Sequence, residues 1–217
     1  MPNMNVYELH CFSIKMVHQV IRRLLDRIAQ GPESPLADVD AYKGFLQSCV
    51  LFIHHHHKNE DDIMFPCLKS KNLDLLALDQ MSMTHSKLNA LLDELTNLAS
   101  ADHLDLNALR KAGSDLSTMM VEHMDQEEAL CTPQNYECAG VSFQDVQDMD
   151  DRIAQETQKE DAAIFLPIIY YNLTHEERTQ WWNQVLPWHL RWIIFPWILA
   201  PKYAGYWRFC LNGPTHG

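Results

Sequence analysis

Histidine and glutamate recur at fixed spacing in the first 130 residues of this 217-residue chain. Nine of its twelve histidines precede residue 124, and two of them begin His-x-x-x-Glu segments, His56 with Glu60 and His123 with Glu127. Residues four apart lie on the same face of an α-helix, so each segment would direct an imidazole and a carboxylate the same way. Both groups are ligands of non-haem iron and manganese, which makes metal binding the first chemistry to consider.

The residues around these side chains follow the period of amphipathic helices. Apolar residues recur every three or four positions and predict four long helices, at about residues 5–30, 38–65, 73–99 and 105–130. The Gly-Pro-Glu-Ser-Pro segment at 31–35 would end the first helix, and Pro66 would end or kink the second. Short connections between helices of similar length favour an all-α, up-down-up-down four-helix bundle.

Each predicted helix carries a histidine on the face that its apolar residues define. Six polar side chains therefore point into the expected core: His18, His56, Glu60, His85, His123 and Glu127. Ionised carboxylates are costly in an apolar core unless they are paired or bound to metal. A single buried histidine is usually a hydrogen-bonded core residue, but one in each of four helices favours a metal site over a metal-free hydrogen-bond network. Two ions suit the set better than one, because glutamates on separate helices can bridge them.

At these residues the sequence resembles the hemerythrin-like (HHE cation-binding) domain family, over about residues 5–133. Residues 56–66 read His-His-Lys-Asn-Glu-Asp-Asp-Ile-Met-Phe-Pro, which is similar to the family's HHxxEE…FP signature, and residues 123–128 look like its fourth-helix motif. The resemblance implies a hemerythrin-like bundle with two non-haem iron ions per chain and both glutamates bridging. It favours iron over manganese as the cofactor.

The resemblance also implies a division of the histidines, with His18 and His56 on one iron and His85 and His123 on the other. The chain departs from oxygen-carrying members in the third helix, where they have a His-x-x-x-His pair and this chain has Met81 four residues before its histidine. The loss of one imidazole would leave an open position on the iron near the third helix. That departure points away from simple reversible oxygen carriage.

In the fourth helix the oxygen carriers use a His-x-x-x-x-Asp motif. Here Glu127 and Glu128 follow the histidine at the fourth and fifth positions. Glu127 fits a shorter variant of the family motif, and Glu128 is the second choice of ligand.

The other histidines are weaker candidates. His54 and His55 would point to other sides of the second helix, and His57, about 100° from the buried face, could support the ligands from outside. His10 could face the edge of the bundle. The remaining histidines are assigned to surface, loop or tail positions: His103, His175, His189 and His216. For His189 we favour a hydrogen-bonded role in the packing of the tail over contact with a substrate.

We divide the chain into a metal-binding bundle at 1–135 and a helical, tryptophan-rich extension at 136–217 packed on it. The extension should contain helices over about 143–171 and from Thr174 to about residue 188. All six tryptophans follow residue 180, but prolines and charged residues interrupt their segment, so no transmembrane helix is expected. We expect residues 181–197 to pack an aromatic face on the bundle and place them beside the open end of the metal site. The alternatives are packing on the bundle with no part in the site, and a membrane-interface or partner surface.

Composition excludes several classes of protein. Asp and Glu number 29 against 17 Lys and Arg, and the net charge of −12 would repel nucleic acid. The six cysteines contain no Cys-x-x-Cys pair, and the N-terminal residues lack the apolar core of a signal peptide, so we expect reduced thiols and a cytoplasmic location.

Three functions fit these features. The first is a non-haem di-iron oxidoreductase that activates dioxygen or peroxide to oxidise a small organic substrate, and the aromatic extension favours it. The second is a carrier, store or sensor of oxygen or iron without turnover. The third, a module whose metal only stabilises the fold, ranks last because buried carboxylates would be an unfavourable means to that end.

Overall fold

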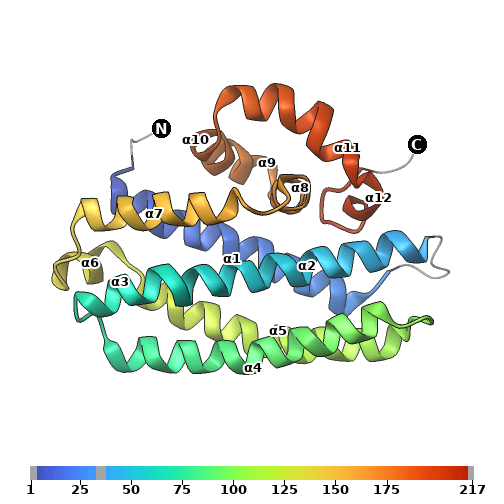
Figure 1. Cartoon of the computed structure of the whole chain (residues 1–217), viewed down its shortest axis with the longest axis horizontal. Coiled ribbons are helices and arrows are strands. Elements are labelled where there is room, and N and C mark those ends of the chain that lie inside the picture. The colour runs from blue at the N-terminus through green and yellow to red at the C-terminus, as the bar shows by residue number, and fades with distance from the viewer. Residues whose placement is uncertain (1–3, 33–37, 215–217) are drawn as a thin grey trace.

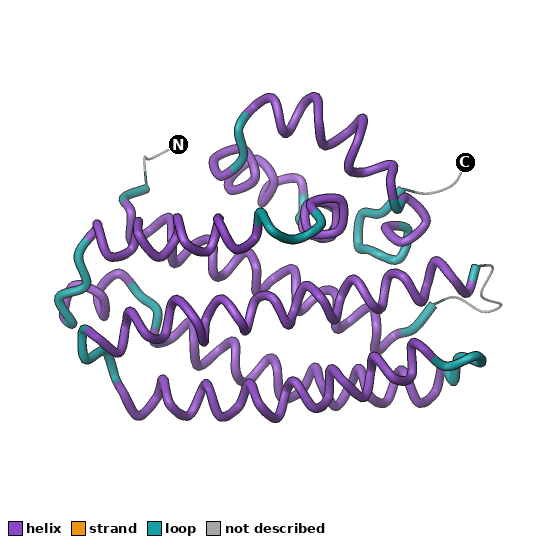
Figure 2. The backbone as a smooth tube through the Cα atoms, in the orientation of Figure 1, coloured by secondary structure: helices purple, strands orange, loops and turns teal. Residues whose placement is uncertain are grey.

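The computed structural model describes residues 4–32 and 38–214, and these residues form helices and connections with no β-strand among them (Figure 1, Figure 2). Four long helical segments lie side by side: α1 (Val6–Gln30), α2 (Val39–Asn59) with its continuation, α4 (Leu75–Ser100) and α5 (Leu106–Leu130). Helix α1 packs on α5, α5 on α4, and α4 on α2. The predicted all-α, up-down-up-down bundle is confirmed.

Side chains that cap the N-termini of the four long helices explain why the first residue of each could be predicted closely. The four helices begin after residues whose side chains accept a hydrogen bond from a backbone N–H in the first turn: Asn5, Asp38, Asp74 and Asp105. Helix α1 ends at Gly31, whose φ of 71° is readily adopted only by glycine. The rest of the predicted break, residues 33–35, lies outside the described residues.

We expected Pro66 either to end or to kink the second helix. The first expectation is wrong, because the helical backbone continues past the proline. A π-helical turn, η1 (Glu60–Met64), comes first, in which the Phe65 N–H donates to the Glu60 carbonyl, and α3 (Phe65–Ser70) continues from it. Because Pro66 has no N–H, it cannot donate the α-helical hydrogen bond to the Asp62 carbonyl. Arg152 donates to that carbonyl at 3.5 Å. The wide turn lets the helix pass the proline with Glu60 at its start.

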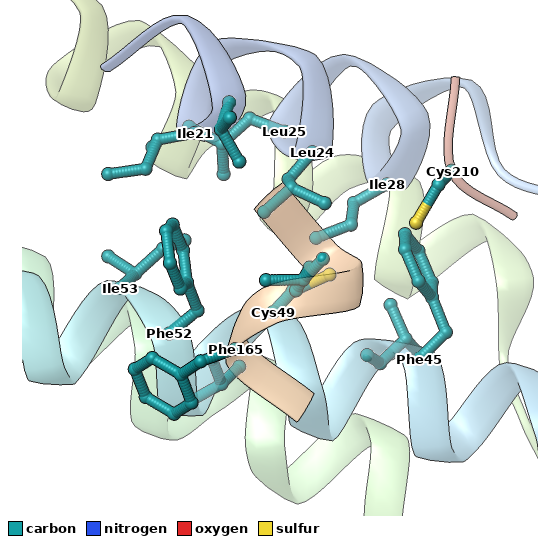
Figure 3. Close-up of a cluster of buried hydrophobic side chains, with 14 of the residues drawn as sticks. Ile21, Leu24, Leu25, Ile28, Phe45, Cys49, Phe52, Ile53, Phe165 and Cys210 are labelled. Carbon is teal, nitrogen blue, oxygen red and sulfur yellow. The ribbon is translucent and has the colours of Figure 1, made fainter. Parts of the chain in front are cut away.

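The main core is shared by the four long helices and the extension, and Figure 3 shows the part of it where α1 and α2 meet. Side chains from these two helices meet there with two from later in the chain: Ile21, Leu24, Leu25, Ile28, Phe45, Cys49, Phe52, Ile53, Phe165 and Cys210. Two glycines permit close packing at its edges. A Cβ on Gly113 would lie 2.6 Å from Cγ2 of Ile28, and a Cβ on Gly44 would overlap the ring of Tyr206. All six cysteines are unpaired.

The C-terminal residues pack across the face of the bundle formed by α1 and α2 (Figure 1). They form a series of helices and turns: α6 (Pro133–Cys138), α7 (Phe143–Thr157), α8 (Ala162–Asn172), α9 (His175–Glu177), η2 (Arg178–Trp182), α10 (Asn183–Val185), η3 (Leu190–Leu199), α11 (Ala200–Lys202) and α12 (Ala204–Trp207). The single helix expected over 143–171 is wrong, because residues 158–161 separate α7 from α8. Thr174 is confirmed as an N-cap, since its side chain accepts a hydrogen bond from the Glu177 N–H.

The tryptophans divide into two sets. Trp181, Trp182 and Trp207 are buried, whereas the side chains at 188, 192 and 197 are 62%, 69% and 79% exposed. Trp181 donates to Ser13 Oγ of α1 at 2.8 Å, which fixes one end of the segment on the bundle. Phe195 is buried with the first two, so part of the segment packs on the bundle. No residue of 181–197 lines the cavity that reaches His56 and Glu60, so the expected place beside the metal site is wrong. No helix in the described parts of the chain has the length and apolar character to cross a bilayer.

Candidate metal centre

The six side chains predicted from the sequence converge in the middle of the bundle. One cluster, which we call group 1, contains His18, His56, Glu60 and Glu127, with one ligand atom of each within 4.8 Å of the others. A second, group 2, contains His57, His85 and His123 at the same spacing. The histidines thus separate as the family resemblance implies, but group 2 includes His57, which the sequence analysis placed outside the six.

The two glutamates lie between the groups. Glu60 Oε1 is 2.8 Å from Nε2 of His56, and Glu60 Oε2 is 3.3 Å from Nε2 of His85. Glu127 Oε2 is 3.2 Å from Nε2 of His18 and 4.0 Å from Nε2 of His123. Each carboxylate therefore reaches an imidazole of both groups, which is the placement that a bridging ligand requires.

His57 occupies the space that the sequence analysis left open near the third helix. Its ring stacks on that of His85, with centroids 4.3 Å apart and planes inclined by 15°. Met81, which stands where a second α4 histidine was sought, is buried in an apolar cluster. Consecutive residues of α2 are about 100° apart, so His56 and His57 can serve the two groups from one helix. The run of four histidines at 54–57 was the available signal.

The polar atoms at the centre lack the partners that a metal-free core would need. Atoms without a well-formed hydrogen bond are His18 Nε2, His56 Nε2, His57 Nε2, His123 Nδ1 and both carboxylate oxygens of Glu60 and Glu127, all of them buried. In group 2 the Nε2 atoms of His85 and His123 lie only 2.9 Å apart. Buried polar groups are normally hydrogen-bonded, and unpaired ones are destabilising. Imidazoles and carboxylates arranged in this way fit metal ions.

Two further carboxylates hold imidazoles from behind. Glu128 Oε1 accepts from His18 Nδ1 at 2.9 Å and from Arg22 Nη1 at 2.7 Å. Asp61 Oδ2 accepts from His85 Nδ1 at 2.9 Å. Such bonds fix the tautomer so that the opposite nitrogen faces the centre. Glu128, the second choice of ligand, therefore lies behind a ligand candidate, and Asp61 was missed although it directly follows Glu60.

Burial and neighbouring charges shift the pKa values of the central side chains in different directions. Burial lowers the pKa of His57 well below its ordinary value and lowers that of His123 to about 4. Burial and the neighbouring Glu60 charge raise the pKa of Glu127. Burial also acts to raise the pKa of Glu60, but the charge on His56 and the close approach of the neighbouring imidazoles outweigh it and lower that pKa. His57 and His123 are thus neutral at pH 7, the form in which imidazole binds metal.

The other histidines lie outside the two groups. His10 pairs with Asp150, and His55 Nε2 lies 3.0 Å from Thr157 Oγ1, so both face the extension. His54 is partly exposed and belongs to neither group. Three others are exposed: His103, His175 and His189. The packing role favoured for His189 is therefore wrong, and His216 lies outside the described residues.

Comparison with known families supports the geometry. A family model described as the hemerythrin HHE cation binding domain matches residues 13–134. No curated protein and no solved structure matches the chain. The matched segment contains both groups and ends before α7.

Proposed function

The chain belongs to the hemerythrin HHE cation-binding domain family and is a metal-binding protein, and from this premise we propose that it is a non-haem di-iron oxidoreductase acting on a small organic substrate with dioxygen. Group 1 would hold one iron and group 2 the other. Both glutamates would bridge, because each carboxylate reaches imidazoles of both groups.

The two metal ions of this proposal would have unequal numbers of ligands. The group 2 ion would have three imidazoles and two bridging carboxylates, whereas the group 1 ion would have two imidazoles and the same carboxylates. The open position expected near α4 therefore moves to the side of His18 and His56. His57 is the reason, since it supplies the imidazole that Met81 cannot.

Bound iron would supply Lewis acidity and the electrons that the reduction of dioxygen requires. The chain's own residues would keep the ligands in place and the site dry. Asp61 and Glu128 orient an imidazole of each group. Phe65 stacks on His85 at 5.5 Å between ring centroids and is itself buried, so it shields group 2 from water.

The observation that carries the enzyme over a carrier or sensor is a cavity of about 180 Å³ that reaches His56 and Glu60. Its outer wall comes from α7 and α8, beyond the segment that the family model matches. A protein that only binds dioxygen would have no use for a space this large beside the metal-ligand candidates. The alternative, a carrier, store or sensor of oxygen or iron, is supported equally by the ligand set alone.

Metal analysis and oxygen consumption test the proposal. Protein from iron-supplemented cells should contain about two irons per chain, and Glu60→Ala and Glu127→Ala should each remove most of the metal. Cys49→Ala, a buried core change outside both groups, serves as the control and should keep it. Full loading of both glutamate variants, or manganese in place of iron, would contradict the metal assignment.

Aerobic addition of a reducing substrate then separates the two functions. Repeated consumption of dioxygen supports the enzyme. A single stoichiometric spectral change without turnover supports the carrier or sensor instead.

A further inference from the structure

The cavity beside group 1 has the size of a single aromatic ring. It lies between α1, α2, α7 and α8, and its volume of about 180 Å³ compares with the roughly 150 Å³ of an apolar cavity that binds benzene. Most of its wall is apolar: Ile14, Val17, Phe52, Met64, Ile153, Phe165 and Ile169. A molecule held there would contact both the extension and the residues next to the metal-ligand candidates.

Besides the metal-ligand candidates His56 and Glu60, two polar side chains in the wall have hydrogen-bonding capacity that the described residues leave unused. His10 is 2% exposed, its Nδ1 lies 2.6 Å from Asp150 Oδ1, and its Nε2 is buried without a partner. When the carboxylate accepts the only ring proton, at Nδ1, Nε2 is an acceptor. Asn59 is 8% exposed, and its side-chain amide makes no hydrogen bond with the described residues.

Other polar side chains in the wall are already engaged. Ser13 Oγ accepts from Trp181, and His55 pairs with Thr157. With His56 and Glu60 assigned to metal, His10 and Asn59 are the groups left to recognise a polar substituent. A buried acceptor that stays unpaired is destabilising, so a hydroxyl that donates to it would bind preferentially.

We infer that the cavity binds a single-ring phenol, whose hydroxyl donates to His10 Nε2 while its ring packs on the apolar wall. Asp150 is a positioning residue, because it fixes the tautomer of His10. The inference rests on the proposed function in treating the phenol as the substrate class. His10 and Asp150 lie on either side of the segment matched by the family model, so this recognition belongs to the chain's own additions.

Calorimetric titration of the full-length protein with phenol and with toluene, under nitrogen, tests the inference without any turnover. The parent should bind one phenol per chain and bind it more tightly than toluene. His10→Leu should weaken phenol binding about five- to tenfold, the loss expected for one hydrogen bond, and leave toluene binding unchanged. Ile153→Trp should abolish both by filling the cavity. His103→Leu, the same substitution at an exposed site, is the matched control and should change neither.

Asp150→Ala keeps the test valid if His10→Leu does not fold, since the Asp150 side chain is 44% exposed and its removal leaves the apolar residues of the wall in place. It should weaken phenol binding and leave toluene binding unchanged. Equal affinities for phenol and toluene in the parent, or unchanged phenol binding in the folded His10 or Asp150 variant, would overturn the inference. Metal content measured in the same samples separates this failure from failure of the proposed function: a metal-free parent that still prefers phenol contradicts only the latter.

Discussion

His57→Phe should remove one metal ligand and leave the fold intact. Phenylalanine keeps a ring that can stack on His85, and it removes an Nε2 atom that is buried without a hydrogen-bond partner. Burial already lowers the pKa of His57 well below its ordinary value, so one neutral ring replaces another. Among the described residues, the one side-chain hydrogen bond lost is a long one, 3.4 Å, to Asn89. Without metal, the variant should therefore be at least as stable as the parent.

The His57→Phe variant should be less stable than the parent only when metal is bound. Loss of a group that only orients a metal ligand weakens binding by roughly 10- to 100-fold. Loss of one of three imidazoles should reach at least the upper value, about 2.7 kcal/mol. Bound metal stabilises the folded state by mass action, so this difference carries into the free energy of unfolding at saturating iron. For a chain of this length it corresponds to a fall in Tm of about 5–11 °C.

Scanning calorimetry with iron and with a chelator, together with metal analysis, measures both effects. His54→Phe is the control, because it lies on the same helix in neither group and its side chain is 35% exposed. The control should match the parent in both conditions. A His57→Phe protein with the parent's iron content and the parent's Tm in iron would refute the assignment of His57 to a metal site.

Two other variants test whether Glu128 holds a metal ligand in place and whether the bundle and the extension unfold together. Glu128→Gln should weaken iron binding by roughly 10- to 100-fold, because Glu128 holds His18; unchanged affinity in a metal titration would contradict this role. Burial raises the pKa of Glu128, but hydrogen bonds from His18 and Arg22 lower it to about 2. Its stabilising contribution is therefore complete above the ordinary value of 4.5 and is lost as the pH falls toward 2, so the parent's advantage over the variant should shrink across that range in acid unfolding. Trp207→Ala should cost about 3–5 kcal/mol in chemical denaturation, with one transition for the whole chain, because Trp207 is fully buried in the core shared by bundle and extension. Two separate transitions would show that the extension folds independently.

The helices and the six ligand candidates could be predicted from the sequence because the information is local. Side chains three and four positions apart share a helix face, so a histidine or glutamate in an apolar stripe is recognisable without knowledge of its neighbours. Caps are equally local, as Asn5 and Thr174 show by accepting hydrogen bonds from the next turn. The apolar stripes also fix the bundle, since each must be buried against another.

Tertiary packing decided which other side chains join the site. His57 lies off the stripe of its helix, and only the approach of α4 places its ring against His85. Asp61 and Glu128 are hydrogen-bonded to histidines of other helices, so their spacing in the sequence carries no trace of the contact. The same holds for Gly44, where a close approach by Tyr206 requires a glycine.

The extension shows most clearly how sequence patterns differ from tertiary packing in what they determine. Its tryptophans marked it as apolar, but composition alone could not say which of them are buried, because that depends on the shape of the surface beneath. The break at 158–161 turns α8 back over α1 and α2, and this turn closes a cavity against His10 and Glu60, residues far apart in the sequence. A helix period records which side of a helix is apolar, whereas a cavity depends on how several helices fail to fill the space between them.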